Sequence, residues 1–201
     1  MARPRQRADA DTATRILDVA ERLVQVRGFN GFSYADVASE LGITKASLHY
    51  HFAGKAELGE ALIERYATRF ADALDAIDAS AGAAPAKLDA YADIYADVLR
   101  DHRMCLCGML AAEYPTLPGP MRASVVSFFD KNEKWLLSVL EQGRADGSLT
   151  FTGSTRDTAR MIISCLEGAM LVARPYGDTP RFRDAAASLL ASLTPATAER
   201  D

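Results

Sequence analysis

The chain has 201 residues, of which 49% are hydrophobic and 25% are charged, so it can bury a substantial core. This composition is not that of an intrinsically disordered protein. No apolar run is long enough to span a membrane, and the N-terminal residues lack the apolar stretch of a signal peptide. We therefore expect a cytoplasmic protein without membrane contact. The net charge of −4 argues against a protein that coats nucleic acid with its whole surface.

Charge is unevenly distributed along the chain. Up to Lys55 there are eight Lys or Arg residues against six Asp or Glu, whereas the remainder has fifteen against twenty-one. Arg3, Arg5 and Arg7 form a basic, irregular arm, which either attracts phosphates or is simply a solvated tail. Contact with a nucleic acid is therefore expected at the front of the chain.

Helical periodicity dominates the chain. Apolar residues recur with a period near 3.6 and no sustained strand-like alternation is present, which predicts an all-α fold. A first helix is predicted from about Asp11 to Arg27, ended by Gly28, and a connecting helix from Lys55 to about Ser80. Breakers at 115–118, 143–147 and 175–177 separate further helices, which are predicted at 87–101, 104–113, 121–144, 155–174 and 180–193.

Two short helices around a tight turn stand between these long ones. Ser33 can cap a helix from Tyr34 to Leu41, Gly42 can make the turn, and Thr44 can cap a third helix that runs through His49. A helix-turn-helix needs such a supporting helix, turn and short second helix, whose first side chains enter the major groove of DNA.

The third helix carries side chains suited to DNA. Thr44, Lys45 and Ser47 could reach base edges or phosphates, and Ala46 permits close approach, for example to a thymine methyl group. Leu48 is predicted to face the core.

The segment FSYADVASELGITKASLHYHFAGKAEL resembles the signature of the TetR family of transcriptional repressors. The resemblance implies a DNA-binding domain at 1–54, which includes the basic arm, and a helical ligand-binding and dimerisation domain at 55–201. It also implies that Lys55 meets a phosphate. Motif and resemblance together predict DNA contacts from the following residues: Ser33, Tyr34, Thr44, Lys45, Ala46, Ser47, His49, Tyr50 and Lys55.

One position departs from the family pattern. The family usually has tyrosine where this chain has His49, so the phosphate contact of that tyrosine does not transfer directly. An imidazole can donate to phosphate, more strongly when protonated, so affinity for DNA could rise as pH falls. Of the neighbouring aromatic residues, Phe52 is predicted to pack in the core, while Tyr50 is assigned to DNA with core packing as its alternative.

The last two predicted helices are suited to pairing. On the helix at 155–174 the apolar residues nearly ring the axis: Met161, Ile162, Cys165, Leu166, Ala169, Met170 and Ala173. The helix at 180–193 has apolar residues at heptad-like spacing. The resemblance implies a homodimer in which both helices form a four-helix bundle with those of a partner, and the alternative is a core within one chain.

The middle helices are rich in aromatic and sulfur-containing residues. The resemblance implies a pocket for a small effector among them, and such pockets are mostly apolar with a few polar groups. The candidate lining residues are Tyr91, Tyr95, Met104, Cys105, Met109, Glu113, Phe128, Trp135 and Cys165.

The cysteines indicate free thiols. Cys105, Cys107 and Cys165 are an odd number and no pair has CxxC spacing, so no disulfide framework, metal site or cofactor is expected. Cys105 and Cys107 would lie on different faces of a regular helix. They are either inert buried cysteines or include a thiol made oxidant-sensitive by the nearby His102 and Arg103.

The leading hypothesis is a homodimeric repressor that a small, apolar or aromatic effector releases from a palindromic operator on double-stranded DNA. The rival is an enzyme using Glu113, His102 and Cys105, but no GxSxG, phosphate-binding glycine loop or HExxH motif is present, so we expect no enzyme. A third possibility is a purely architectural dimer that binds no effector.

Overall fold

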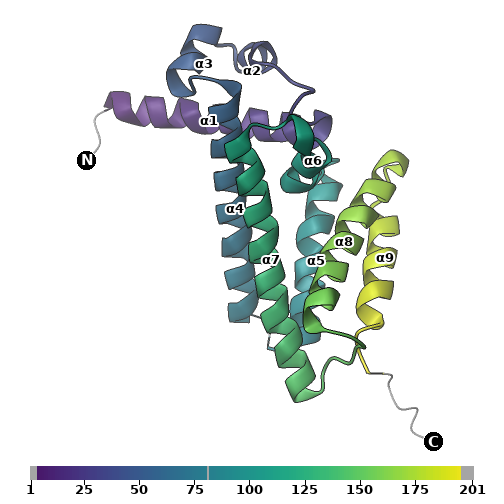
Figure 1. Ribbon diagram of the computed structural model, residues 1–201. Coiled ribbons are helices and arrows are strands. Elements are labelled where there is room, and N and C mark those ends of the chain that lie inside the picture. Colours follow the sequence, from purple (N-terminus) through teal and green to yellow (C-terminus); the bar gives the residue numbers. More distant parts are fainter. Residues whose placement is uncertain (1–3, 81, 196–201) are drawn as a thin grey trace, which may run out of the picture. The chain divides into compact units, whose positions relative to one another are not determined.

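The computed structural model describes residues 4–80 and 82–195, with side chains from residue 9 onward (Figure 1). Every regular element in these ranges is helical, so the predicted all-α fold is confirmed. The chain forms two compact units, one from residues up to Thr68 with Cys105–Val126, the other from Arg69–Met104 with residues from Ser127 onward. None of the helices in these ranges has the length and apolar composition needed to cross a bilayer.

The first unit is built on the N-terminal helices. α1 packs against α2 and α6, and α2 packs against α3 (Figure 1). Ile16, Leu23, Val37, Leu48 and Leu58 are at most 1% exposed and form its core. Its elements are α1 (Pro4–Arg27), α2 (Tyr34–Leu41), α3 (Lys45–His51), the start of α4 (Lys55–Ser80), α6 (Leu106–Ala112), the 3-10 turn η1 (Tyr114–Thr116) and the start of α7 (Gly119–Asp146).

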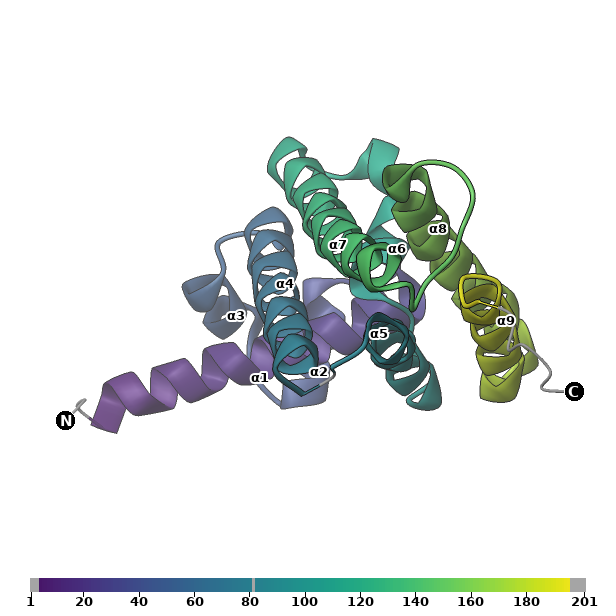
Figure 2. The same ribbon diagram turned by 90° about the horizontal axis from the view of Figure 1, so that it is seen from below.

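The second unit contains the rest of α4 and α7 together with three further helices. α8 and α9 lie side by side, and α5 packs against both (Figure 2). Leu88, Tyr91, Tyr95 and Phe182 are among its most deeply buried side chains. The further elements are α5 (Ala84–Arg100), α8 (Thr155–Ala173), the 3-10 turn η2 (Arg174–Tyr176) and α9 (Thr179–Ala191).

One sequence-based expectation about a helix end was wrong. α1 begins at Pro4 instead of near Asp11, so Arg5 and Arg7 belong to a helix and not to an irregular arm, while Arg3 lies outside the described residues. A proline suits the first turn of a helix, where its missing N–H costs nothing.

α7, predicted at 121–144 with a break at 143–147, runs from Gly119 to Asp146 and so passes through Gly143. Gly143 is a packing residue, because an added Cβ would lie 2.5 Å from Leu149 Cδ1. Gly147, whose φ is +75°, provides the left-handed residue with which helices commonly end.

Candidate nucleic-acid interface

The start of α2 is fixed by a reciprocal capping box. The Ser33 hydroxyl accepts from the backbone N–H of Asp36, and the Asp36 carboxylate accepts from the backbone N–H of Ser33 at 2.7 Å. Hydrogen bonds from Ser33 lower the pKa of Asp36 below its ordinary value of 3.8. The predicted cap at Ser33 is thus confirmed, and the S-x-x-D pattern could have identified Asp36 as its partner.

The turn between α2 and α3 follows the predicted chemistry. Gly42 ends α2 with a φ of +65°, a left-handed conformation that glycine adopts without the cost borne by other residues. Thr44 then caps α3, its hydroxyl accepting from the backbone N–H of Ser47 at 3.1 Å. Caps on both sides of a left-handed glycine hold the two short helices in a helix-turn-helix.

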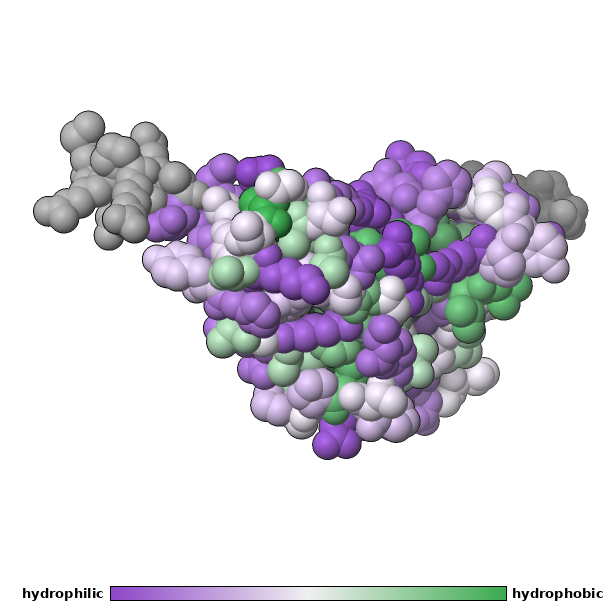
Figure 3. Space-filling model, turned by 90° about the horizontal axis from the view of Figure 1, so that it is seen from above, coloured by the Kyte–Doolittle hydropathy of each residue, from purple (hydrophilic) through white to green (hydrophobic). Residues whose placement is uncertain are grey.

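One face of α3 is free while the opposite face is anchored. Leu48 has no exposed surface, as predicted. Lys45, Ala46, His49 and Tyr50 are exposed, and they follow the i, i+1, i+4, i+5 spacing of one helix face. Tyr50 is the most exposed large hydrophobic residue among those described, at 75%. In the view of Figure 3, purple and white side chains cover much of the surface that is drawn, with smaller green areas between them.

An aromatic pair joins α2 to α3. The rings of Tyr34 and His49 are 4.8 Å apart between centroids and tilted by 51°, and the Tyr34 hydroxyl donates to the carbonyl of Phe52 at 3.1 Å. Burial, with a smaller contribution from the Glu57 carboxylate, raises the pKa of Tyr34 to about 12. Phe52 is 8% exposed, which agrees with its predicted place in the core.

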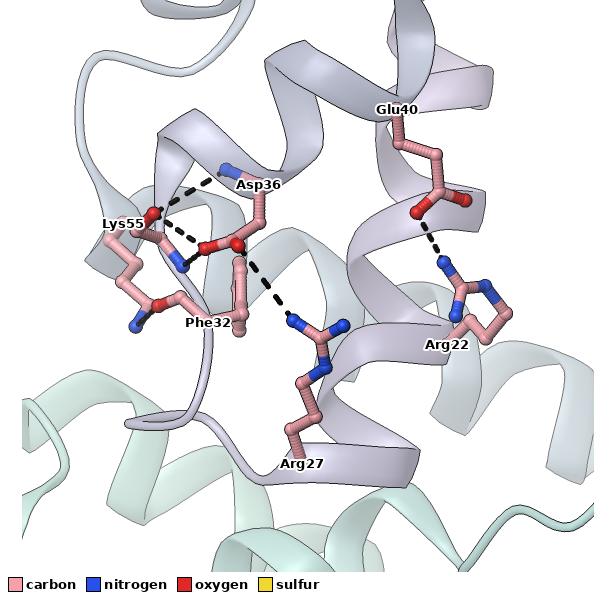
Figure 4. A network of polar contacts seen from close by, with 7 residues as sticks. Arg22, Arg27, Phe32, Asp36, Glu40 and Lys55 are labelled. Carbon is pink, nitrogen blue, oxygen red and sulfur yellow. Dashed lines mark hydrogen bonds and ion pairs between the residues drawn. The ribbon is translucent and has the colours of Figure 1, made fainter.

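Lys55 turns toward the loop that precedes α2. Its Nζ donates to the carbonyl of Phe32 (Figure 4). The same Nζ lies 4.7 Å from the ring centre of Phe29 and 4.3 Å from that of Phe32. Burial lowers the pKa of Lys55, and the carboxylates of Glu113 and Asp36 partly oppose this. The ammonium therefore helps to fix this loop, and its contact with a DNA phosphate stays a prediction.

Two ion pairs join α1 to α2, one at each end of α2. Arg22 pairs with Glu40, and Arg27 lies 3.7 Å from the Asp36 carboxylate (Figure 4). Exposed pairs of this kind contribute little to stability, generally less than about 1 kcal/mol. Their main effect is to orient α2 on α1. We call α1, α2 and α3 together the reading head.

Glu113, predicted as a pocket residue, lies at the end of α6 beside the reading head. Its carboxylate accepts from the backbone N–H groups of Phe29 and Asn30, and the Asn30 side chain donates to Thr116 Oγ1 at 2.8 Å. Gly28 makes this approach possible, because its φ is +83° and an added Cβ would lie 2.9 Å from Glu113 Oε1. Nothing in the local sequence signals this contact, which joins residues far apart in the chain.

Four other predicted pocket residues meet in the second unit. Tyr91 of α5 stacks on Trp135 of α7 with centroids 5.5 Å apart, and its hydroxyl donates to Asn132 Oδ1 at 3.1 Å. The Tyr91 and Tyr95 hydroxyl oxygens are 3.0 Å apart, and Phe128 is buried in the same cluster, in edge contact with Phe70. Sequence reasoning missed the buried Asn132, which no motif marks.

The remaining predicted pocket residues are dispersed. Met104 is buried in the second unit, whereas Cys105 and Met109 belong to the first. Cys165 is exposed on α8. Whether any of these nine residues lines an effector pocket stays a prediction.

The thiols at 105 and 107 are hidden from solvent. Cys105 is 1% exposed and Cys107 is fully buried. The Cys105 sulfur caps α6 by accepting from the backbone N–H of Gly108 at 3.5 Å. This burial favours the inert alternative over a sensing thiol. Among the described residues, no three His, Cys, Asp or Glu side chains gather as a metal site.

Comparison with known families covers most of the chain. A family model described as bacterial regulatory proteins, tetR family, matches residues 16–62. A second, described as tetracyclin repressor-like, C-terminal domain, matches residues 84–189. The first match contains α2, the turn and α3.

Individual proteins support the same relationship. The transcriptional regulator AcuR of Cereibacter sphaeroides is 29% identical over 178 residues, which cover 86% of this chain and 81% of AcuR. The HTH-type transcriptional repressor NemR of Escherichia coli K12 is 26% identical over 172 residues, covering 82% and 84%. A crystal structure of a TetR-family transcriptional regulator from Agrobacterium tumefaciens is 33% identical, with a TM-score of 0.90, and the match covers 93% of this chain and all of that one.

Proposed function

Because this chain belongs to the TetR family of bacterial transcriptional regulators, we propose that it represses transcription from a palindromic operator and is released by a small-molecule effector. The observation that carries the proposal is the exposed face of α3, with Lys45, Ala46, His49 and Tyr50 outward and Leu48 buried. A short capped helix with one exposed face matches the major-groove element of helix-turn-helix proteins.

We propose that the protein acts as a homodimer through α8 and α9, the helices predicted at 155–174 and 180–193. A two-fold dimer presents two identical reading heads, so its operator would be palindromic. Leu171, Val172 and Met161 of α8 are 62%, 56% and 40% exposed in the single chain. Apolar surface gathered on one helix is typical of an interface. Nothing lies within 4 Å of the position of an added Cβ at Gly168, so a second helix could approach closely there.

A shallow groove beside these residues supports the same surface. It has a volume of about 310 Å³ and is lined by Cys165, Ala169 and Val172 of α8 and by Ala185 and Leu189 of α9. Side chains from a partner's α8 and α9 could fill it. Two heads carried by such a dimer would read half-sites about one helical turn of DNA apart.

We place the effector site among α4, α5 and α7 of the second unit. Phe70, Tyr91, Phe128 and Trp135 form an aromatic cluster there, and the hydroxyl of Tyr91 and the amide of Asn132 are polar groups within it. This composition suits a small apolar or aromatic molecule with one hydrogen-bonding group. Such a molecule releases DNA only if it binds the released conformation more tightly than the DNA-bound one.

The contact of Glu113 with the reading head offers a route for this release. A shift of α6 would withdraw the carboxylate from the backbone N–H groups of Phe29 and Asn30, and the loop between α1 and α2 would lose its anchor. The same engagement speaks against the rival hypothesis of catalysis by Glu113, since its oxygens already accept hydrogen bonds from the protein.

The proposal is tested by selecting sequences from random DNA on the purified protein and then screening metabolites for release of the selected site. We expect a palindromic consensus, which Lys45→Glu abolishes, whereas Lys134→Glu makes the same charge change on an exposed residue of α7 and preserves it. A selection that yields no sequence above background would overturn the proposed function. Enrichment of a single, non-repeated half-site would contradict the proposal that the protein binds DNA as a dimer.

A further inference from the structure

We propose that His49 contacts a phosphate of the operator only when its imidazole is protonated, so that operator affinity rises as pH falls. This inference rests on the proposed function and concerns one residue of the DNA-facing surface. It follows from which ring nitrogen is already engaged within the protein.

The first step is the hydrogen bond made by Nδ1. His49 Nδ1 lies 3.1 Å from the carbonyl oxygen of Ala53. A carbonyl can only accept a hydrogen bond, so the proton of the neutral ring belongs to Nδ1. Nε2 of the neutral ring therefore carries a lone pair and no proton.

The second step is the orientation of the ring. Its contact with the Tyr34 ring, 4.8 Å between centroids, and its bond to Ala53 hold it from two sides. Ala53 is itself fixed, because its backbone N–H donates to Glu57 Oε2 at 2.9 Å. Exchanging the roles of the two nitrogens would break the bond to Ala53, so this tautomer is favoured.

The third step concerns the partner on DNA. His49 is exposed on the same face of α3 as Lys45 and Ala46. A phosphate oxygen accepts hydrogen bonds and is anionic, so it is repelled by the lone pair of a neutral Nε2 and attracted by the N–H of an imidazolium.

The surrounding groups do not supply the same pH dependence. Tyr34 of α2, with its pKa raised to about 12, stays neutral and keeps donating to Phe52 throughout the neutral range. Glu57 of α4 accepts from the backbone N–H of Ala53, and Lys45 lies one helical turn before His49 on α3. His51, in ring contact with Tyr50, is the other histidine of α3 and serves as the matched control.

The experiment measures operator dissociation constants at about pH 6 and about pH 8, at equal ionic strength, with the sequence selected above. The wild type should bind about tenfold more tightly per reading head at the lower pH, the gain expected of a charge-assisted hydrogen bond. The dependence of log K on log salt should also steepen by about 0.9 per head at the lower pH.

Three variants identify the residue responsible. His49→Gln and His49→Tyr each present a donor at every pH, so their affinities should change little between the two pH values. His51→Gln should keep the wild-type response. An equal wild-type affinity at both pH values, or a His49→Gln variant with an undiminished response, would overturn the inference while leaving the proposed function intact. Failure to bind any DNA at either pH would instead overturn the proposed function, and this inference with it.

Discussion

α3 and α8 differ most in what they leave exposed. Each buries a leucine, Leu48 in α3 and Leu166 in α8, with at most 1% of its surface exposed. α3 presents Lys45 and His49 to solvent, whereas α8 presents Leu171 and Val172. A helix that meets hydrated phosphates can keep polar groups outward in the free protein, but a helix that meets another helix carries an apolar face whose burial stabilises the complex.

The largest effect on operator affinity is expected from introducing charged residues on the exposed apolar face of α8. Leu171→Glu combined with Val172→Glu should separate the proposed dimer, because the carboxylates of both copies would be buried together at the proposed interface. Loss of bivalent binding should weaken operator affinity about 100-fold or more. Sedimentation velocity gives the mass and a DNA titration the affinity.

The control for this change is Val126→Glu on α7, where the native valine is 45% exposed and lies outside the proposed dimer surface. It should change neither mass nor affinity. A double α8 variant that still sediments as a dimer would show that pairing uses another surface.

Substitutions on the two faces of α3 should have different effects, one on the stability of the protein and the other on its affinity for DNA. Leu48→Ala removes a fully buried side chain and should lower the free energy of unfolding by about 2–5 kcal/mol. Tyr50→Ala, on the exposed face, should change it by less than about 0.5 kcal/mol while weakening DNA binding. Urea unfolding and DNA titration measure the two quantities, and equal stability losses would contradict this division of α3.

Glu113→Gln tests the anchor between α6 and the reading head. The neutral amide forms weaker hydrogen bonds than the carboxylate, so unfolding should become easier by about 1–2 kcal/mol. Amide hydrogen exchange at Phe29 and Asn30 should quicken. Glu141→Gln, an exposed change in α7, is the control and should leave both measurements unaltered.

Smaller losses are expected from the helix caps. Ser33→Ala and Thr44→Ala each remove a side-chain acceptor from the start of a helix and should lower the free energy of unfolding by about 1 kcal/mol. Ser33→Asp keeps an acceptor and should recover most of the loss. If alanine and aspartate behaved alike at 33, the capping box would have no measurable role.

The smallest change is a pH dependence at Asp36. Its pKa is lowered in the folded protein, so its contribution to stability is present above the unfolded-state value of about 3.9 and is lost as pH falls through the folded value. Asp36→Asn should therefore flatten the acid side of the stability curve, measured by urea unfolding below about pH 5. A variant with the wild-type slope would assign that slope to other carboxylates.

The helix-turn-helix of the reading head could be predicted from the sequence because the residues that end and begin its helices act locally. Ser33, Gly42 and Thr44 act within a few residues of themselves, and each takes the predicted role. The same reasoning predicted that Leu48 is buried, because helical periodicity alone decides which face it occupies.

Contacts between segments far apart in the sequence could not be predicted from the sequence alone. Nothing near Glu113 in the sequence indicates that it meets Phe29, and nothing near Tyr91 indicates that it meets Asn132. The packing of Gly143 against the side chain of Leu149 was likewise not indicated by the residues around either position.

The close approach of Glu113 to Gly28 also bears on how this chain can vary. Any side chain at position 28 would be strained by the positive φ and would press on the carboxylate, whose oxygens lie within 3.0 Å of an added Cβ. Without a glycine at 28 the carboxylate of Glu113 would have to move away from its present position. A glycine at 28 without an acceptor at 113 would leave two backbone N–H groups without their carboxylate. We therefore expect the two positions to be inherited as a pair, and relatives that lose one to have lost or replaced the other.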